Sequence, residues 1–378
     1  MSAWVKGLAQ FWPIGVALML LLSPVRWRFW PLALVLLLLV LTPLALALGA
    51  VDPYLVRLQA LICITAILAV SLNLINGVTG LFSLGHAGFA IVGAYTASIL
   101  TAFLFRLGPE TPMGLAIPAF IFSLVMGGLT AAILGILVGL PTLRLRGDYL
   151  AIATLGFGEI VCVILRFITF RRAVGGQVFE VGGPRGIQDL PSMPGPHLPG
   201  HEATVPIVMS FVFSLIVLAI IVWATRNFVF SSHGRACAAI REDEVAAEIL
   251  GVDTVFYKVG TFALGAFFAG VGGGLLAHWS NMVHPSMGNF LRSIEYLIIV
   301  YVGGAGSLSG SLLAAILLTV FGELLKDWMR EYDAWRMALY GVILVAVMLW
   351  RPRGLFGGRE FPWLQPRAGA GAAGHGTA

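Results

Sequence analysis

Charged residues are scarce in this sequence. Of its 378 residues only 11% are Asp, Glu, Lys or Arg, whereas 59% are hydrophobic, and the mean hydropathy is +0.94. Soluble domains are about one quarter charged and about half apolar. A water-soluble fold would therefore leave large apolar patches exposed. This composition excludes an ordinary soluble domain and indicates an all-α, polytopic bundle of transmembrane helices.

Cysteine is also rare, and the motifs of common catalytic sites are missing. The three cysteines, Cys63, Cys162 and Cys237, are far apart and share no ligand spacing, so we assign no disulfide framework and no metal site. The sequence has no phosphate-binding loop of the form G-x-x-x-x-G-K-[ST], no zinc motif and no G-x-S-x-G. We assign no catalytic residue and do not expect the chain to be an enzyme on its own.

Apolar segments of transmembrane length are abundant. A spanning helix needs about 20 mostly apolar residues. Two shorter segments are ambiguous, because 11–25 is either a span or an interfacial helix and 292–302 is short enough to be broken or re-entrant. With these, the sequence predicts about ten or eleven spans. The clear ones lie at residues 30–48, 58–75, 82–105, 113–140, 149–170, 205–224, 259–279, 309–325 and 337–350.

Basic residues beside short loops predict the orientation of these spans, because cytoplasmic loops carry an excess of Lys and Arg. Arg351 and Arg353 follow the last predicted span, which places the C-terminus in the cytoplasm. Counting backwards through the spans makes residues 225–258 a cytoplasmic loop and residues 171–204 an external loop.

Polar residues inside the spans are candidates for a transport pathway, because polar groups at membrane depth are costly and usually face the bundle interior. Ser83 and His86 lie at the edge of one span, and Glu159 is the most conspicuous ionisable residue inside another. The alternative for His86 is an interhelical hydrogen bond. The alternative for Glu159 is a structural or gating role.

A short pattern occurs twice at predicted span boundaries. Residues 77–83 and 303–309 both read G-x-x-G-x-x-S. Paired glycine-interrupted segments in two halves of a transporter point to a central site, and on this basis Gly303, Gly306 and Ser307 join the pathway candidates. Coincidence is the alternative in a chain with 46 glycines.

The predicted cytoplasmic loop contains a charged, alanine-rich stretch. Ser232 precedes a run of helix-favouring residues, and Gly251 can end a helix in the left-handed conformation. We expect one or two short helices here. Helices this short are marginal alone, which favours a partner protein packed against them. The alternative is a solvated loop helix held by its own ion pairs.

Four stretches resemble the permease subunit of ABC importers for branched-chain amino acids, of the LivM type. The resemblance covers most of the chain, roughly residues 58–356, and it implies an ABC importer permease with its core at residues 58–357. Membrane segments at residues 1–57 precede this core, and the low-complexity C-terminal end predicts a flexible cytoplasmic tail at residues 358–378. The stretches are SLNLINGVTGLFSLGHAGFAIVGAY (71–95), LRLRGDYLAIATLGFGEI (143–160), GRACAAIREDEVAAEILGV (234–252), and SIEYLIIVYVGGAGSLSGSLLAA (293–315) with RPRGLFG (351–357).

The resemblance gives the charged loop a role, since ABC permeases carry an E-A-A-x-x-x-G motif on a cytoplasmic coupling helix. Ala246, Ala247 and Gly251 match this motif, whereas Val245 stands at the Glu position and Glu244 is one residue early. The predicted ATPase-coupling residues are Arg241, Glu242, Asp243, Glu244, Ala246, Ala247 and Gly251.

The external loop resembles the family as well. Residues 181–187 are similar to a T-G-G-P-x-G-[IL] pattern, with Val replacing Thr. This similarity makes Gly182, Gly183, Pro184 and Arg185 candidates for contact with a binding protein.

The family resemblance implies a membrane permease that translocates branched-chain or related hydrophobic amino acids delivered by a periplasmic binding protein. The implied partners are a LivH-like second permease subunit and two ATPase subunits in a bacterial inner membrane. ATP and Mg²⁺ would bind to the ATPases, and no cofactor is expected on this chain. An ion-gradient-driven secondary transporter or channel, and an ABC permease for urea or amides, are the alternatives.

Overall fold

The computed structural model describes residues 52–105, 111–142, 148–174, 177–195 and 204–328, together with residues 341, 342, 345, 349, 354 and 360. The long helices are α4 (Pro53–Asn73), α5 (His86–Ile99), α6 (Met113–Thr142), α7 (Asp148–Phe167), α8 (Thr204–Phe230), α11 (Thr254–Ser280), α12 (Phe290–Gly303) and α13 (Leu308–Trp328). The shorter elements are π-helices η1 (Leu74–Val78) and η2 (Leu100–Leu104), strands β1 (Thr169–Val174) and β2 (Gln177–Gly182), helices α9 (Ser232–Glu242) and α10 (Glu244–Ile249), and the 3₁₀-helix η3 (Pro285–Gly288).

Seven helices in the described part of the chain are long and apolar enough to cross a membrane. They confirm the seven spans predicted between residues 58 and 325. The predicted short segment 292–302 is the 14-residue helix α12, which is shorter than a spanning helix. The predicted segments 11–25 and 30–48 lie outside the described residues, and 337–350 lies largely outside them.

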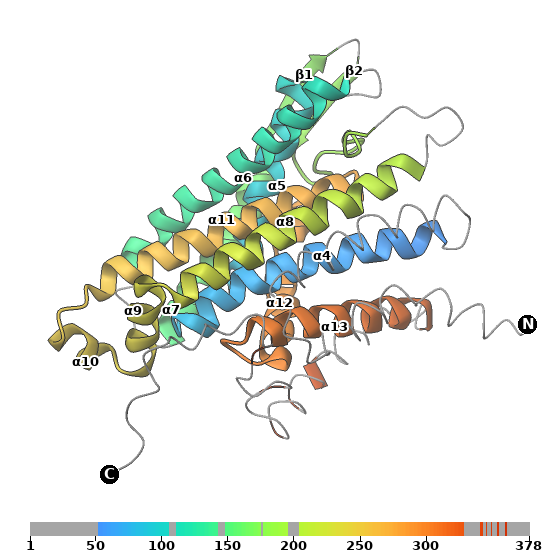
Figure 1. The fold of residues 1–378 in the computed structure, drawn as a ribbon. Helices are drawn as coiled ribbons and strands as arrows, with labels where there is room; N and C mark the ends of the chain where they lie inside the picture. Colours follow the sequence, from blue (N-terminus) through green and yellow to red (C-terminus); the bar gives the residue numbers. More distant parts are fainter. Residues whose placement is uncertain are drawn as a thin grey trace, which may run out of the picture.

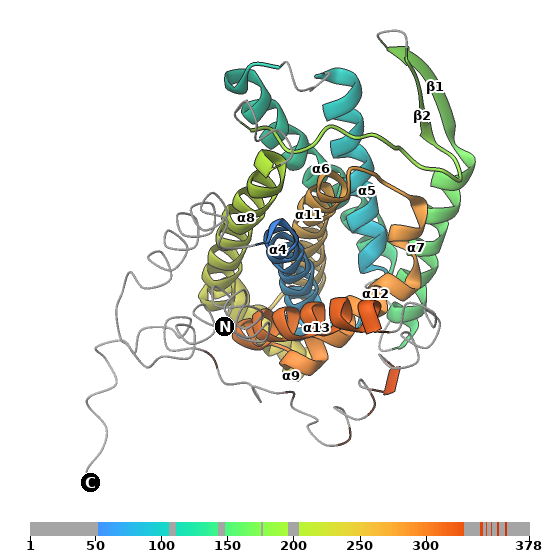
Figure 2. The same ribbon diagram turned by 90° about the vertical axis from the view of Figure 1, so that its right-hand side faces the viewer.

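Helix α4 lies at the centre of the bundle (Figure 2). It is apolar on all sides, and nearly all of its residues after Arg57 are buried against α8, α11, α12 and α13. A helix that is hydrophobic all round belongs in an interior. Helix α11 is its other buried neighbour, packed between α4, α5 and α6.

Small residues set the spacing between these inner helices. A Cβ atom at Gly93 of α5 would overlap the backbone of Gly270 of α11, and one at Gly273 would overlap the carbonyl of Ala90. Close backbone approach of this kind is typical of membrane bundles, where packing drives association. The one-turn spacing of Gly270 and Gly274 therefore serves helix packing.

Two helices are interrupted at the same end of the bundle. Helix α4 ends in the π-helical turn η1, after which residues 79–85 run to α5 without regular structure. Helix α12 stops at Gly303, and residues 304–307 turn the chain into α13. A π-helical turn inserts an extra residue into the helix and leaves backbone groups free for other contacts.

The predicted external loop contains a β-hairpin that its sequence did not indicate. The predicted span 149–170 ends at Phe167, and an antiparallel hairpin of β1 and β2 follows, with Arg171 in register opposite Glu180. The hairpin lies at the end of the molecule opposite α9 and α10 (Figure 1). The two loops predicted on opposite sides of the membrane therefore do lie at opposite ends of the bundle.

Candidate functional site

Helices α9 and α10 form a compact cap at one end of the bundle, joined by Asp243. One or two short helices were expected here, and the structure has two. Helix α9 starts one residue earlier than predicted, because Ser231 and not Ser232 is its N-cap and accepts from the Gly234 amide. The Asp243 carboxylate accepts from the amides of Val245 and Ala246, which satisfies the first turn of α10. Gly251 has φ of +84° and follows the last turn, as a left-handed end requires.

The acidic side chains of α10 are used within the chain. Glu244 pairs with Lys258 of α11 at 2.6 Å, and the Lys258 side chain is only 7% exposed. The Glu248 carboxylate accepts from the Thr254 hydroxyl at 2.8 Å. The predicted ATPase-coupling acids Asp243 and Glu244 therefore hold α10 in place, whereas Glu242 lies exposed on the surface of α9; Asp243 is exposed as well.

The outward face of α10 is apolar. Val245, Ile249 and the C-cap residue Leu250 have exposed fractions of 52%, 81% and 82%, while Ala247 is buried. Ala246 is exposed beside them. Three large aliphatic side chains on a short helix outside the bundle are the mark of a surface that another protein covers.

Helix α9 is fastened to the bundle by its inner side. Cys237 is fully buried, and its Sγ lies 3.1 Å from the Thr261 hydroxyl of α11. Burial raises the pKa of the Cys237 thiol above its usual range. The thiol therefore behaves as a small packing group.

Arg241, a predicted coupling residue, reaches from α9 to the membrane bundle. Its guanidinium donates to the carbonyl of Gly77 at the end of η1. Gly306, in the turn between α12 and α13, lies so close that a Cβ atom there would sit 2.8 Å from Nη1 of Arg241. Gly306 also has φ of +88°, which few other residues adopt without strain.

Asn73 joins the two interrupted helices beside Arg241. Its carboxamide oxygen accepts from the Gly306 amide at 2.7 Å, and its nitrogen donates to the Ser307 carbonyl at 3.0 Å. The two G-x-x-G-x-x-S stretches thus lie against each other. We call this set, Asn73, Gly77, Arg241 and Gly306, the junction.

The C-terminal part of the chain reaches the same end of the bundle. The Glu360 carboxylate accepts from the Leu308 amide at 2.6 Å, the Ser309 amide at 3.0 Å and the Ser309 hydroxyl at 2.7 Å. It therefore caps the first turn of α13, where a negative charge is favourable. Gly354 lies against Gly304 nearby.

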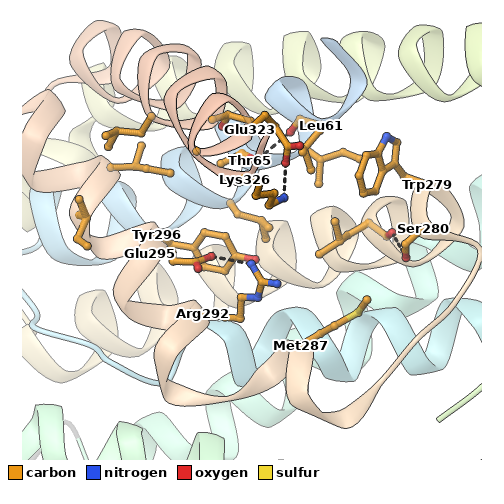
Figure 3. Close-up of a pocket in the computed structure, with 18 residues that line it drawn as sticks. Leu61, Thr65, Trp279, Ser280, Met287, Arg292, Glu295, Tyr296, Glu323 and Lys326 are labelled. Atoms are coloured by element: carbon orange, nitrogen blue, oxygen red, sulfur yellow. Dashed lines mark hydrogen bonds and ion pairs between the residues drawn. The ribbon is translucent and has the colours of Figure 1, made fainter. Parts of the chain in front are cut away.

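A cavity of about 190 Å³ opens at the opposite end of the bundle, between α4, α11, α12 and α13 (Figure 3). Two ion pairs line this cavity. Arg292 pairs with Glu295 on α12 at 2.7 Å, and Lys326 pairs with Glu323 on α13. Its other lining residues are largely apolar. None of the predicted pathway residues lines this cavity.

The predicted pathway residues Ser83, His86 and Glu159 instead make contacts between segments. The Nε2 atom of His86 lies 2.8 Å from the Ser71 hydroxyl, and the Asn76 carboxamide accepts from the Ser83 amide. The Glu159 carboxylate accepts from the Phe290 amide at 2.8 Å, at the start of α12. Glu159 therefore ties α7 to the short helix α12.

The remaining pathway candidates lie at the α12–α13 turn. Gly303 packs so closely on Gly310 that a Cβ atom would overlap its carbonyl. The Ser307 hydroxyl accepts from the Gly310 amide at 3.0 Å and lies 3.2 Å from the Ser309 hydroxyl. These residues shape the turn that carries Gly306 to the junction.

The external-loop candidates form a tight turn. The Gly183 amide donates to the carbonyls of Leu165 and Ile168, and Ile187 forms a β-bridge with Val283. Pro184 and Arg185 are exposed at the top of this turn, while Gly183 is buried. Gly182 is the last residue of β2. Of the four candidates, Pro184 and Arg185 thus present side chains that a partner could reach.

The bundle of membrane-length helices, with a cap of short helices at one end and a cavity at the other, defines a multi-pass membrane permease. The family model for the branched-chain amino acid transport system permease component matches residues 54–348. The chain belongs to this family, and it is a transport subunit and not an enzyme.

The sequence is also similar to individual permeases. It is 35% identical to the high-affinity branched-chain amino acid transport system permease protein LivM of Escherichia coli (strain K12), over 83% of this chain and 71% of that protein. It is 26% identical to BraD of Pseudomonas aeruginosa and 25% identical to LivH of E. coli K12, each over 78% of this chain and 92% of the relative. No solved structure matches it.

Proposed function

We propose that this chain is the LivM-like permease subunit of an ATP-driven importer for branched-chain or related hydrophobic amino acids. The observation that carries the proposal is the apolar outer face of α10, formed by Val245, Ile249 and Leu250. A partner must cover this face, and a permease of this family that lacks a phosphate-binding loop needs a separate ATPase.

The orientation follows from the same end of the molecule. Glu360 binds the first residue of α13, and Gly306 just before it contacts Arg241 of α9, so one assignment places the cap and Glu360 on the cytoplasmic side. The basic residues after position 350 favour that assignment. We propose a bacterial inner membrane location and about ten or eleven spans, with the further spans outside the described residues.

The two ends of the bundle support different partners. A LivH-like second permease would complete the pathway in the membrane, and two ATPase subunits, which bind ATP and Mg²⁺, would dock on the cytoplasmic caps. A periplasmic binding protein would dock at the hairpin end, where Pro184 and Arg185 are exposed.

The junction supplies a route from the ATPases to the membrane helices. A movement of α10 moves α9, because Asp243 is the cap shared by both helices. Arg241 then carries the movement to Gly77 and Gly306, at the ends of two interrupted helices. Packed helices switch between discrete arrangements. ATP drives such a switch only if it binds the two arrangements unequally.

Reconstitution of the whole transporter tests this proposal. Ala246→Glu places a charge on the exposed face of α10, and we expect ATP hydrolysis to continue without leucine uptake. Gly251→Val strains the left-handed position, whereas the control Gly251→Asn keeps it accessible. Unchanged ATP-driven uptake and assembly in Ala246→Glu would contradict the proposal. Uptake driven by an ion gradient without ATPase, and lost in Glu159→Gln, would support a secondary transporter in its place.

A further inference from the structure

Two ion pairs meet at the cavity between α4, α11, α12 and α13, although each is local to its own helix. Arg292 pairs with Glu295 and Lys326 pairs with Glu323, both at i,i+3 spacing. Exposed pairs of this kind contribute little to stability. Charged groups in a membrane bundle are costly and commonly functional. Stability alone therefore does not explain why two pairs from different helices line one cavity.

In both ion pairs the basic side chain is more exposed than the acidic one. The side chains of Arg292 and Lys326 are 51% and 49% exposed, whereas those of Glu295 and Glu323 are 20% and 19% exposed. The cations therefore lie at the mouth, and the acids lie deeper. A ligand with adjacent negative and positive groups can contact both pairs, and its zero net charge matches that of the four side chains.

The inner wall of the cavity is aliphatic. It includes Leu68 of α4, Ile298 and Ile299 of α12, and Leu318 of α13. The hydroxyl of Thr319 also lines the cavity, and it is buried without a hydrogen-bond partner among the described residues. Buried polar atoms are nearly always hydrogen-bonded, so this hydroxyl is available to a ligand.

The size of the cavity suits a small molecule. Its volume of about 190 Å³ is several times the roughly 30 Å³ that one water occupies in the liquid. Figure 3 shows the two ion pairs on either side of this space, with Thr65 of α4 behind the α13 pair.

We propose that this cavity binds a zwitterionic α-amino acid with an aliphatic side chain. Its carboxylate contacts Arg292 and Lys326, its ammonium contacts Glu295 and Glu323, and its side chain lies toward Leu68 and Ile299. This inference rests on the proposed function, and it places a substrate subsite within this chain and apart from the binding protein.

Cysteine protection tests the subsite in the full transporter, in membrane vesicles without ATP or binding protein. The three native cysteines are buried, so background labelling is low. Thr65→Cys and Thr319→Cys each place a thiol at the cavity. We expect a charged thiol reagent to label them, and L-leucine to slow the labelling. Isoamylamine and isovalerate, which each carry one of leucine's two charged groups, should not protect. Ser232→Cys on exposed α9 is the control, whose labelling leucine should leave unchanged.

A charge variant links protection to the ion pairs. Arg292→Gln should raise the leucine concentration needed for protection by about tenfold, which corresponds to about 1.4 kcal/mol. Arg166→Gln, at the exposed end of α7 and outside the cavity, should not change it. Arg292→Lys should restore part of the protection.

Each outcome of the labelling experiments either supports or overturns the zwitterion site. Protection by leucine alone, weakened in Arg292→Gln, supports it. Equal protection by all three compounds shows apolar binding only and overturns the zwitterion site. Failure of both cysteines to label, or labelling that leucine does not slow, also overturns it. ATP-driven leucine uptake measured on the same vesicles is a separate readout, so loss of the subsite and loss of the proposed function are distinguishable.

Discussion

The two ends of the bundle place charged and apolar side chains in opposite ways. At the α9–α10 cap, Glu244 and Arg241 turn toward the bundle, and Ile249 faces outward. At the cavity, Arg292 and Lys326 lie at the open mouth, and aliphatic side chains form the inner wall. The cap has the pattern of a surface that binds protein, whereas the cavity has the pattern of a site that binds a small polar molecule.

The junction end and the cavity end of the bundle also differ in how tightly they are packed. At the junction, the backbones of Gly77 and Gly306 touch each other and Asn73, with no room for a methyl group. The cavity end leaves space and a hydroxyl without a partner among the described residues. We infer that movement passes through the tight end and that ligand is held at the open end.

The largest predicted effect is at the junction. A Cβ atom at Gly77 would overlap both the Asn73 carboxamide and the Gly306 amide, and neither can move away without breaking their hydrogen bond. We expect Gly77→Ala to cost about 3 kcal/mol or more, since overpacking a tight site costs about 1–3 kcal/mol and sometimes more. The thermal midpoint of the purified transporter measures this effect.

A matched control lies in α11. A Cβ atom at Gly260 would have no atom of a neighbouring element within 4 Å, so Gly260→Ala meets open surroundings. Alanine is the better helix former by about 1 kcal/mol, and Gly260→Ala should leave the midpoint unchanged or raise it. Equal destabilisation by the two substitutions would show that the junction is not tighter than an ordinary helix surface.

A smaller effect is expected at the pair of Glu244 and Lys258. Lys258→Met leaves the Glu244 carboxylate without its partner, and the Glu244 side chain is 27% exposed. Removing one member of a fully buried pair costs about 3–5 kcal/mol, and water access to Glu244 should reduce this to about 1–2 kcal/mol. Thermal unfolding of Lys258→Met, Glu244→Gln and the double variant measures the coupling. Glu242→Gln, on the exposed side of α9, should have no effect. A coupling energy of zero would mean that the pair does not hold α10.

Much of the fold could be predicted because it depends on local composition. Apolar runs of about 20 residues mark spanning helices, and seven of them were found where the structure has them. The sequence also indicated that α12 is short, because its apolar segment covers only residues 292–302. The hairpin was missed, because a two-stranded element beside a span shows no long periodic pattern.

The candidate site was predicted less completely. The alanines and Gly251 indicated short helices. However, Glu244 holds α10 through an ion pair with Lys258 of α11, and sequence spacing alone does not reveal that contact. Arg241 binds the carbonyl of Gly77, and a backbone carbonyl carries no residue-specific signal. The cavity was missed for a related reason. In the sequence, each ion pair looks like an ordinary i,i+3 surface pair, and only the packing of α12 beside α13 brings the two pairs to one cavity.

We propose that the aliphatic face of α10 binds the ATPase, while the acids of the loop hold α10 in place. Co-purification of the ATPase with the double variant Ile249→Ser, Leu250→Ser tests it most directly, with Glu242→Gln as the matched charge control. Both aliphatic side chains are more than four-fifths exposed, at 81% and 82%, so the permease should keep its thermal midpoint. We expect the double variant to lose the ATPase and Glu242→Gln to retain it. Retention of the ATPase by the double variant, with loss in Glu242→Gln, would show that the charged residues and not the aliphatic face bind the ATPase.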